Sequence, residues 1–201
     1  LMMRAYHHQR GEPGRTQVLI PDSAHGTNPA STSMAGYSVL EIPSDARGNI
    51  DIDALKVACD QNVVGLMLTN PNTLGLFEEK IEEIVSVVHS CGGLVYGDGA
   101  NMNALAGIAR PGDLGFDLMH FNLHKTFGTP HGGGGPGSGP VAASRDVMPY
   151  LPGPVVVETD GHADGPRYRL KMPEKSIGRV CSFHGSFGVL VRAYAYIRMH
   201  G

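Results

Sequence analysis

The sequence is poor in charge, and its charged residues form no patch of one sign. Charged residues make up 17% of the 201 positions, below the roughly 25% usual in soluble proteins, and the formal net charge is -3. Lysine and arginine form no cluster, so the chain carries no electrostatic footprint for nucleic acid. No apolar run approaches the roughly 20 residues of a membrane-spanning helix. These absences leave a globular protein that handles a small molecule.

Cysteine is also scarce, and its spacing excludes the usual cysteine frameworks. Cys59, Cys91 and Cys181 lie far apart with no Cys-x-x-Cys pair, and the residues before them lack the pattern of a secretory segment. This usage predicts a reducing, cytoplasmic location. The chain starts at Leu1, and an apolar periodic segment runs up to its last residues, so we expect a fragment.

Glycine, in contrast, is abundant: its 28 residues are about twice the average share. Many of them fall in residues 132–139, shortly after Lys125. Glycine lets the backbone approach a ligand closely, at an entropic cost that a purely structural loop has little reason to carry. The pKa of a lysine falls readily in a desolvated setting, and the neutral amine can then attack a carbonyl. Residues 120–140 are therefore predicted to hold a ligand at Lys125, the alternative being a flexible surface loop with a solvated lysine.

Apolar runs alternate with helix-compatible segments along the chain. Strands are predicted at residues 18–20, 37–42, 63–69, 94–96, 116–123 and 139–143, with a possible hairpin at 167–171. Helices are predicted at residues 1–9, 30–36 with Thr27 or Asn28 as N-cap, 52–60, from Glu78 to the glycines at 92–93, and 190–197. Strands that alternate with helices indicate an α/β fold with a mostly parallel sheet and helices on both faces.

Four polar side chains follow predicted strands: His25, Asn72, Asp98 and Lys125. Ligands bind beyond the carboxyl ends of the strands in such sheets, so we expect one crevice to hold all four. Each residue also has a structural alternative. Asp98 can be a turn residue before a glycine, His25 a polar residue at a helix start, and Asn72 the former of an Asx-turn.

A lysine and an aspartate are the groups expected around pyridoxal phosphate. Asp98 would keep the pyridine nitrogen protonated, and the imidazole of His25 can stack on the face of the ring. The amide of Asn72 can bond the phenolate oxygen, while backbone NH groups with Thr126 or Ser138 can bind the phosphate. The combination predicts a pyridoxal-phosphate site with Schiff-base chemistry at the lysine.

Two other kinds of site fit the sequence less well. Residues 132–139 resemble a phosphate-binding loop, but they lack the lysine and hydroxyl that close one, and Pro136 interrupts the helix that should follow. A metal site would use His120, His124 and His131, yet the first two flank an apolar strand rather than one helical face, and no carboxylate is adjacent.

Five segments carry a resemblance to a known family: residues 22–31, 69–75, 98–101, 110–115 and 120–140. They resemble the pyridoxal-phosphate glycine decarboxylase of the glycine cleavage system, in its C-terminal half or second subunit. The resemblance covers nearly the whole chain, and the motif across 122–137 is the most specific part of it. The chain departs from the family at Gly97, where a larger residue is usual, and at Gly128, where serine or cysteine is usual.

The resemblance implies a fold, a reaction and two partners. The fold is the large domain of fold type I pyridoxal-phosphate transferases, incomplete over residues 1–201 because the upstream phosphate-binding segment and the C-terminal small domain are not in the sequence. The reaction is decarboxylation of glycine, with transfer of the aminomethyl group to the lipoyl arm of the H-protein. The N-terminal half of the enzyme is the other expected partner, and the isolated piece is expected to be inactive.

The resemblance makes Lys125 the cofactor lysine, and the other site residues are predicted around it. His131 is a candidate proton donor or carboxylate contact, and Ala100 is a small residue that leaves room for a substrate without a side chain. The predicted catalytic residues are Lys125, His25 and His131; the predicted cofactor-binding residues are Lys125, Asp98, His25, Asn72, Ala100, Asn122 and Thr126. Another fold type I enzyme, such as a cysteine desulfurase or an aldolase, and a non-catalytic subunit-like fragment remain the alternatives.

Overall fold

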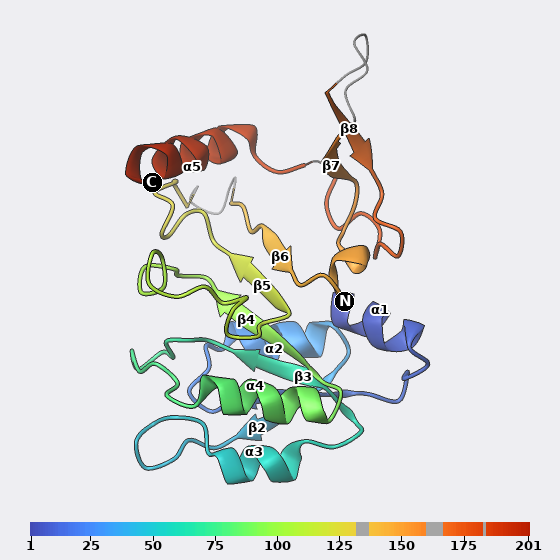
Figure 1. Ribbon diagram of the computed structural model, residues 1–201, viewed down its shortest axis with the longest axis vertical. Helices are drawn as coiled ribbons and strands as arrows, with labels where there is room; N and C mark the ends of the chain where they lie inside the picture. The colour runs from blue at the N-terminus through green and yellow to red at the C-terminus, as the bar shows by residue number, and fades with distance from the viewer. Residues whose placement is uncertain (132–136, 160–166, 183) are drawn as a thin grey trace.

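The computed structural model describes residues 1–131, 137–159, 167–182 and 184–201. Its centre is a six-stranded sheet of order β2-β1-β3-β4-β5-β6, in which every pairing is parallel except that of β6 with β5 (Figure 1). A separate two-stranded hairpin is formed by β7 and β8. The strands are β1 (Gln17–Pro21), β2 (Ser38–Ile42), β3 (Val63–Leu68), β4 (Leu94–Gly99), β5 (Leu118–Phe121), β6 (Val141–Ala143), β7 (Val155–Glu158) and β8 (Tyr168–Lys171).

Helices cover both faces of the sheet, as the sequence predicts (Figure 1). The chain runs from β1 outward to β2 and then back past β1 to β3, so right-handed crossovers place the helices of these two connections on opposite faces. The next connection continues in the second direction, which puts α4 beside α3. The helices are α1 (Met2–Gln9), α2 (Thr27–Met34), α3 (Ile52–Ala58), α4 (Ile81–Ser90), the short 3-10 helix η1 (Met148–Tyr150) and α5 (Phe187–His200).

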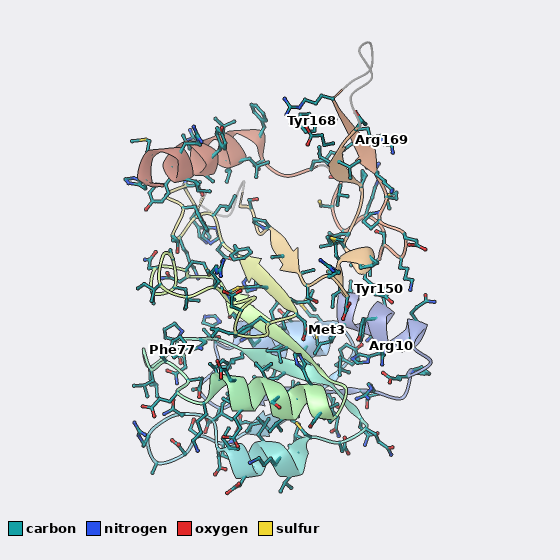
Figure 2. The ribbon with its side chains drawn as sticks, in the orientation of Figure 1. Met3, Arg10, Phe77, Tyr150, Tyr168 and Arg169 are labelled. Atoms are coloured by element: carbon teal, nitrogen blue, oxygen red, sulfur yellow. The ribbon has the colours of Figure 1, made fainter. Side chains whose placement is uncertain are left out.

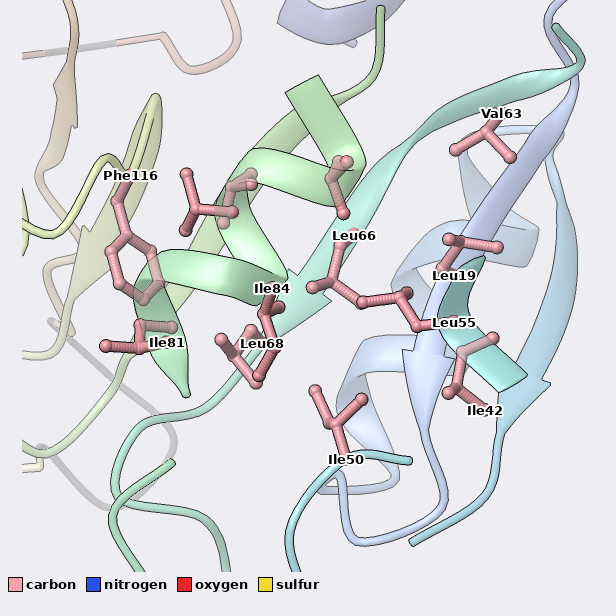
Figure 3. Packing of buried hydrophobic residues seen from close by; sticks show 13 residues of the cluster. Leu19, Ile42, Ile50, Leu55, Val63, Leu66, Leu68, Ile81, Ile84 and Phe116 are labelled. Carbon is pink, nitrogen blue, oxygen red and sulfur yellow. The ribbon is translucent and has the colours of Figure 1, made fainter. Parts of the chain in front are cut away.

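Two buried clusters hold these layers together. Leu55 of α3, Leu66 of β3 and Ile84 of α4 meet in the cluster under α3 and α4, and each is fully buried (Figure 3). Burying one such side chain contributes roughly 1.5–3 kcal/mol. Met3 of α1 and Tyr150 of η1 belong to the cluster on the other face (Figure 2). Because residues of β3 enter both clusters, this strand is covered on both sides and lies in the middle of the sheet.

Three local predictions are wrong in detail. Helix α2 begins at Thr27 with Gly26 as its N-cap, so neither Thr27 nor Asn28 caps it. Helix α4 begins at Ile81 rather than at Glu78, because the Glu78 carboxylate is buried and accepts the backbone N–H of Ile50 at 3.0 Å. Strand β5 is shorter than predicted, since pairing with β4 ends at Phe121 and the chain turns there.

The C-terminal elements lie away from the body of the sheet. The predicted hairpin at 167–171 is wrong in extent: Tyr168–Lys171 is a single strand that pairs with β7, and Figure 2 shows Tyr168 and Arg169 on it. Helix α5 packs through Val189 and Ala193 against Leu123, in the loop after β5. Within the described ranges, no helix combines the length and apolar character needed to cross a membrane.

A stability prediction follows from the close approach of β4 to β5 at Gly99. A Cβ atom on Gly99 would lie 2.4 Å from the carbonyl oxygen of His120, a backbone atom that cannot rotate away. The variant Gly99→Ala should therefore lose about 1–3 kcal/mol of unfolding free energy, as overpacked cores do. Thermal unfolding of the full-length protein measures this. Gly112→Ala is the matched control, because a Cβ there meets no atom within 4 Å; equal melting temperatures for the two variants would contradict the prediction.

Candidate functional site

A cavity of about 390 Å³ opens at the carboxyl edge of the sheet. Its walls come from the segments that follow β1, β3, β4 and β5, as expected where a parallel sheet reverses its strand order. Six of the eight residues predicted for the site line this cavity: His25, Asn72, Asp98, Ala100, Asn122 and Lys125. The sequence therefore predicted correctly that these side chains meet.

Lys125 lies on a tight turn after β5. Its N–H donates to the carbonyl of Asn122 at 3.2 Å, and its own carbonyl accepts from Gly128 at 3.3 Å. The side chain is exposed on the cavity wall, and no described residue forms a hydrogen bond or ion pair with Nζ. The amine is thus available for a ligand. From the sequence we expected the Lys125 amine to be shielded from solvent, but the described residues leave this side chain exposed.

Asp98 is the buried charge of the site. It belongs to β4, not to a turn, and its side chain is only 7% exposed. One carboxylate oxygen, Oδ1, accepts the backbone N–H of Ala100 at 3.0 Å. Within the described part of the chain no group donates a hydrogen bond to Oδ2. A carboxylate that lines a cavity and has one oxygen without a donor among the described residues suits a ligand that carries an N–H.

A histidine and a tyrosine that the sequence reasoning missed stand behind Asp98. His120 of β5 is the direct register partner of Asp98, and its Nε2 lies 3.4 Å from Asp98 Oδ1, an electrostatic contact rather than a short hydrogen bond. Its Nδ1 is 2.7 Å from the hydroxyl of Tyr96, and the two rings stack. Aligning the two parallel strands would have placed His120 opposite Asp98; the sequence reasoning weighed it only as a metal ligand.

The protonation states of this group follow from burial. Burial, with the Asp98 charge, raises the pKa of Tyr96 to about 12, so its hydroxyl keeps its proton and donates to His120 Nδ1. Burial lowers the pKa of His120, an effect that Asp98 opposes and Lys125 reinforces. His120 is thus neutral at pH 7 and carries its hydrogen on Nε2, toward Asp98. The Nε2–H of His120 therefore faces the buried carboxylate of Asp98, which lines the cavity.

His25 and Asn72 line the cavity while also serving the local structure. His25 Nδ1 accepts the N–H of Thr27 at 3.0 Å, so the imidazole supplies the acceptor at the start of α2 that the sequence assigned to a capping side chain. Asn72 Oδ1 accepts from Leu74 and Leu76, and its Nδ2 donates to the carbonyl of Gly48 at 3.0 Å. The Asx-turn alternative therefore describes the Asn72 side chain, which orders the loop after β3.

Two predicted residues, Thr126 and His131, do not line the cavity. Thr126 Oγ1 instead accepts the backbone N–H of Met102 at 2.7 Å and so ties the loop after β4 to the lysine turn. His131 is exposed, and its ring packs edge-on against that of His124, with 4.3 Å between the ring centroids. Residues 132–136 of the glycine-rich segment that follows Lys125 lie outside the described residues.

The two departures from the family pattern both occupy tight positions. A Cβ on Gly97 would meet the ring of Phe116 at 2.8 Å, so a larger residue needs this ring to move. Gly128 has a φ of +67°, a region that favours glycine, and a Cβ there would lie 3.0 Å from the ring of Tyr196 in α5. The small residue at each position thus matches the packing around it.

The arrangement fits the predicted pyridoxal phosphate and gives no support to a metal. An unpartnered amine, a buried carboxylate with an open oxygen and the half-buried Ala100 face one cavity. In the part of the chain that the structure describes, no group of three His, Cys, Asp or Glu side chains is placed to hold a metal. Of the three histidines considered for that role, one contacts Asp98 and the other two pack on each other.

Comparison with solved structures confirms the predicted fold. Sphingosine-1-phosphate lyase Bpss2021 of Burkholderia pseudomallei is 19% identical with a TM-score of 0.67, and the match covers 100% of this chain and 45% of that one. The cysteine desulfurase CsdA of Escherichia coli is 23% identical with a TM-score of 0.65, covering 98% and 49%. The chain has the α/β fold of the large domain of fold type I pyridoxal-phosphate enzymes. At this level of identity the likeness concerns the fold alone.

Comparison of sequences gives much closer relatives. A probable glycine dehydrogenase (decarboxylating) subunit 2 from Exiguobacterium sibiricum is 58% identical over 201 residues, and that from Alkaliphilus oremlandii is 54% identical over 202 residues. Both matches cover all of this chain and 40% of the relative, so the chain spans less than half the length of these proteins. The family model described as glycine cleavage system P-protein matches residues 16–179. Since this match takes in every strand of the sheet and the whole lining of the cavity, the chain belongs to the glycine cleavage system P-protein family.

Proposed function

We propose that the protein to which this chain belongs decarboxylates glycine and transfers the remaining aminomethyl group to the lipoyl arm of the H-protein. The observation that carries the proposal is the cavity, which joins a lysine with no partner among the described residues and a buried aspartate in a chain of the P-protein family. The names of the relatives, glycine dehydrogenase (decarboxylating) subunit 2, support glycine as the substrate and a second subunit as a partner.

Each side chain of the cavity has a proposed task toward pyridoxal phosphate. Lys125 Nζ binds the aldehyde carbon covalently, since this amine has no partner among the described residues. Asp98 Oδ2 accepts the N–H of the pyridine nitrogen, and its charge keeps this nitrogen protonated. His25 would cover one face of the ring and Ala100 would lie near the other, where a small residue would admit a substrate with no side chain.

Decarboxylation needs a place for the electron pair of the Cα–carboxylate bond, and bound pyridoxal phosphate supplies that electron sink. The chain contributes position and charge. Asp98 is fixed by the Ala100 N–H and by the neutral His120 behind it, so its orientation does not depend on the ligand. Asn72 and Asn122 complete the wall on the two sides of this aspartate.

The remaining proposals concern groups that the cavity does not contain. A proton-donor role for His131 requires its ring to leave His124 and enter the cavity. Thr126 Oγ1 donates its hydrogen to Asn101 Oδ1 at 3.3 Å, so it can donate to a phosphate only if it gives up this bond. We also propose a cytoplasmic location, which the wide spacing of the cysteines along the sequence supports.

The first test concerns the lysine. Full-length protein loaded with pyridoxal phosphate and reduced with borohydride should carry the cofactor on Lys125, as mapped by mass spectrometry of peptides. Lys125→Ala should abolish the label, whereas Lys56→Ala, at a lysine paired with Glu83 in an exposed ion pair at 2.8 Å, should leave it unchanged. Label recovered on another lysine would remove Lys125 from the site.

The second test concerns the aspartate. Asp98→Ala should lower turnover by on the order of 100-fold or more, because the fixed charge toward the ring nitrogen is lost. Cofactor occupancy, measured by visible absorbance, should change much less, since the covalent attachment at the lysine is intact. Asp113→Ala is the control, because Asp113 is exposed and pairs only with Arg110 in its own turn. Near-normal turnover of the Asp98 variant would refute its role.

The third test concerns the reaction. The complete assembly, with the partner subunit and lipoylated H-protein, should exchange labelled bicarbonate into the carboxyl group of glycine, and exchange should depend on the H-protein. Scintillation counting of glycine measures it. No exchange, together with activity on cysteine or threonine, would move the protein to the desulfurases or aldolases of the same fold.

A further inference from the structure

Two of the three cysteines, distant in sequence, are brought together at the edge of the sheet opposite the cavity. Cys59 is the C-cap of α3 and Cys91 the C-cap of α4, and these two helices lie side by side (Figure 1). Each residue comes shortly before the strand that follows it, so both sit at the amino edge of the sheet. Both side chains are partly buried against the cluster under α3 and α4.

Each thiol shifts the pKa of the other, and both side chains pack against the same buried cluster. Cys91 Sγ also lies 3.1 Å from the carbonyl of Val88 in the last turn of its own helix. Two thiols at the ends of neighbouring helices that share one core form a candidate dithiol pair.

The charges around the pair make the two sulfurs unequal. The Arg15 guanidinium lies over the residue that follows Cys91: a Cβ on Gly92 would be 2.6 Å from its Nη2. Arg15 is held there by Glu12 at 3.1 Å and by the carbonyl of Val63 at 2.7 Å.

These surroundings favour the thiolate at Cys91. The hydrogen bond from Cys59, assisted by the N–H of Gly93 and by Arg15, lowers the pKa of Cys91 to about 6, although burial opposes the shift. The same hydrogen bond, with burial and the neighbouring Asp60 carboxylate, raises the pKa of Cys59. Near neutral pH the pair therefore holds one thiolate and one thiol.

We propose that Cys59 and Cys91 form a redox-active pair, in which Cys91 is the attacking sulfur and Cys59 the resolving one, and which peroxide converts into a disulfide between the ends of α3 and α4. The Cys91 thiolate attacks one oxygen of hydrogen peroxide, forming a sulfenic acid and releasing hydroxide. The Cys59 thiol then attacks the sulfenic sulfur, and its proton leaves with the sulfenic hydroxyl as water. The hydroxide from the first step combines with the proton that Cys91 released on ionising and gives the second water. Two thiols and one peroxide thus give one disulfide and two waters.

Mass spectrometry after peroxide treatment of the full-length protein tests the proposal. Non-reducing trypsin digestion should yield residues 57–80 linked to residues 81–125, and a dithiol reductant should separate them. In Cys59→Ser, a sulfenic acid should remain on Cys91 and react with dimedone. Cys181→Ser is the control, because Cys181 lies elsewhere in the chain and should not affect the link.

Alkylation kinetics on the unmodified sequence give a second measurement that needs no variant to fold. Reaction of Cys91 with iodoacetamide should rise through about pH 6, where its thiolate forms. At pH 7 it should be about tenfold faster than reaction of the exposed Cys181. Recovery of Cys59 and Cys91 as reduced thiols at a peroxide dose that oxidises Cys181 would overturn the proposal. So would alkylation of Cys91 that rises only above pH 8.

Discussion

The parallel pairing of β4 with β5 is the constraint on which the cavity depends. It sets Asp98 opposite His120 and Gly99 opposite Phe121. Successive residues of a strand point to opposite faces, so a slip of one residue would turn Asp98 away from the lysine turn. Gly99 helps to keep the strands in this register, because the His120 carbonyl occupies the space that any side chain there would need. The backbone hydrogen bonds between β4 and β5 thus position the Asp98 carboxylate without the help of a ligand.

The electrostatics of the cavity follow from this geometry. A buried carboxylate normally costs free energy, and Asp98 offsets that cost through the Ala100 N–H and the dipole of a neutral histidine rather than through a salt bridge. Lys125 also lines the cavity, and the described residues include no ion pair between it and the aspartate. The carboxylate and the amine are therefore separate groups. An ion pair between them would have left neither group available to a ligand.

Much of this could be predicted from the sequence, for identifiable reasons. The run 63–68 is apolar and β-branched because β3 is covered on both faces, and the polar residues after each strand mark the edge where ligands bind. Capping was harder: the acceptor at the start of α2 is the imidazole of His25, whose preference for that role is weak. His120 was missed because its partner Asp98 is distant in sequence, and only the strand register relates them. Thr126 and His131 carry the right chemistry but point elsewhere, a matter of loop geometry that no periodicity encodes.

Helix α5 and the lysine turn are coupled by direct contact. Tyr196 sits so close to Gly128 that the turn has no room for a side chain, while Val189 and Ala193 clamp Leu123 on its other side. The turn that presents Lys125 is therefore braced from the C-terminal end of the chain as well as from the sheet. A displacement of α5 would therefore be passed on to the turn through these side-chain contacts and would change the position of the Lys125 amine.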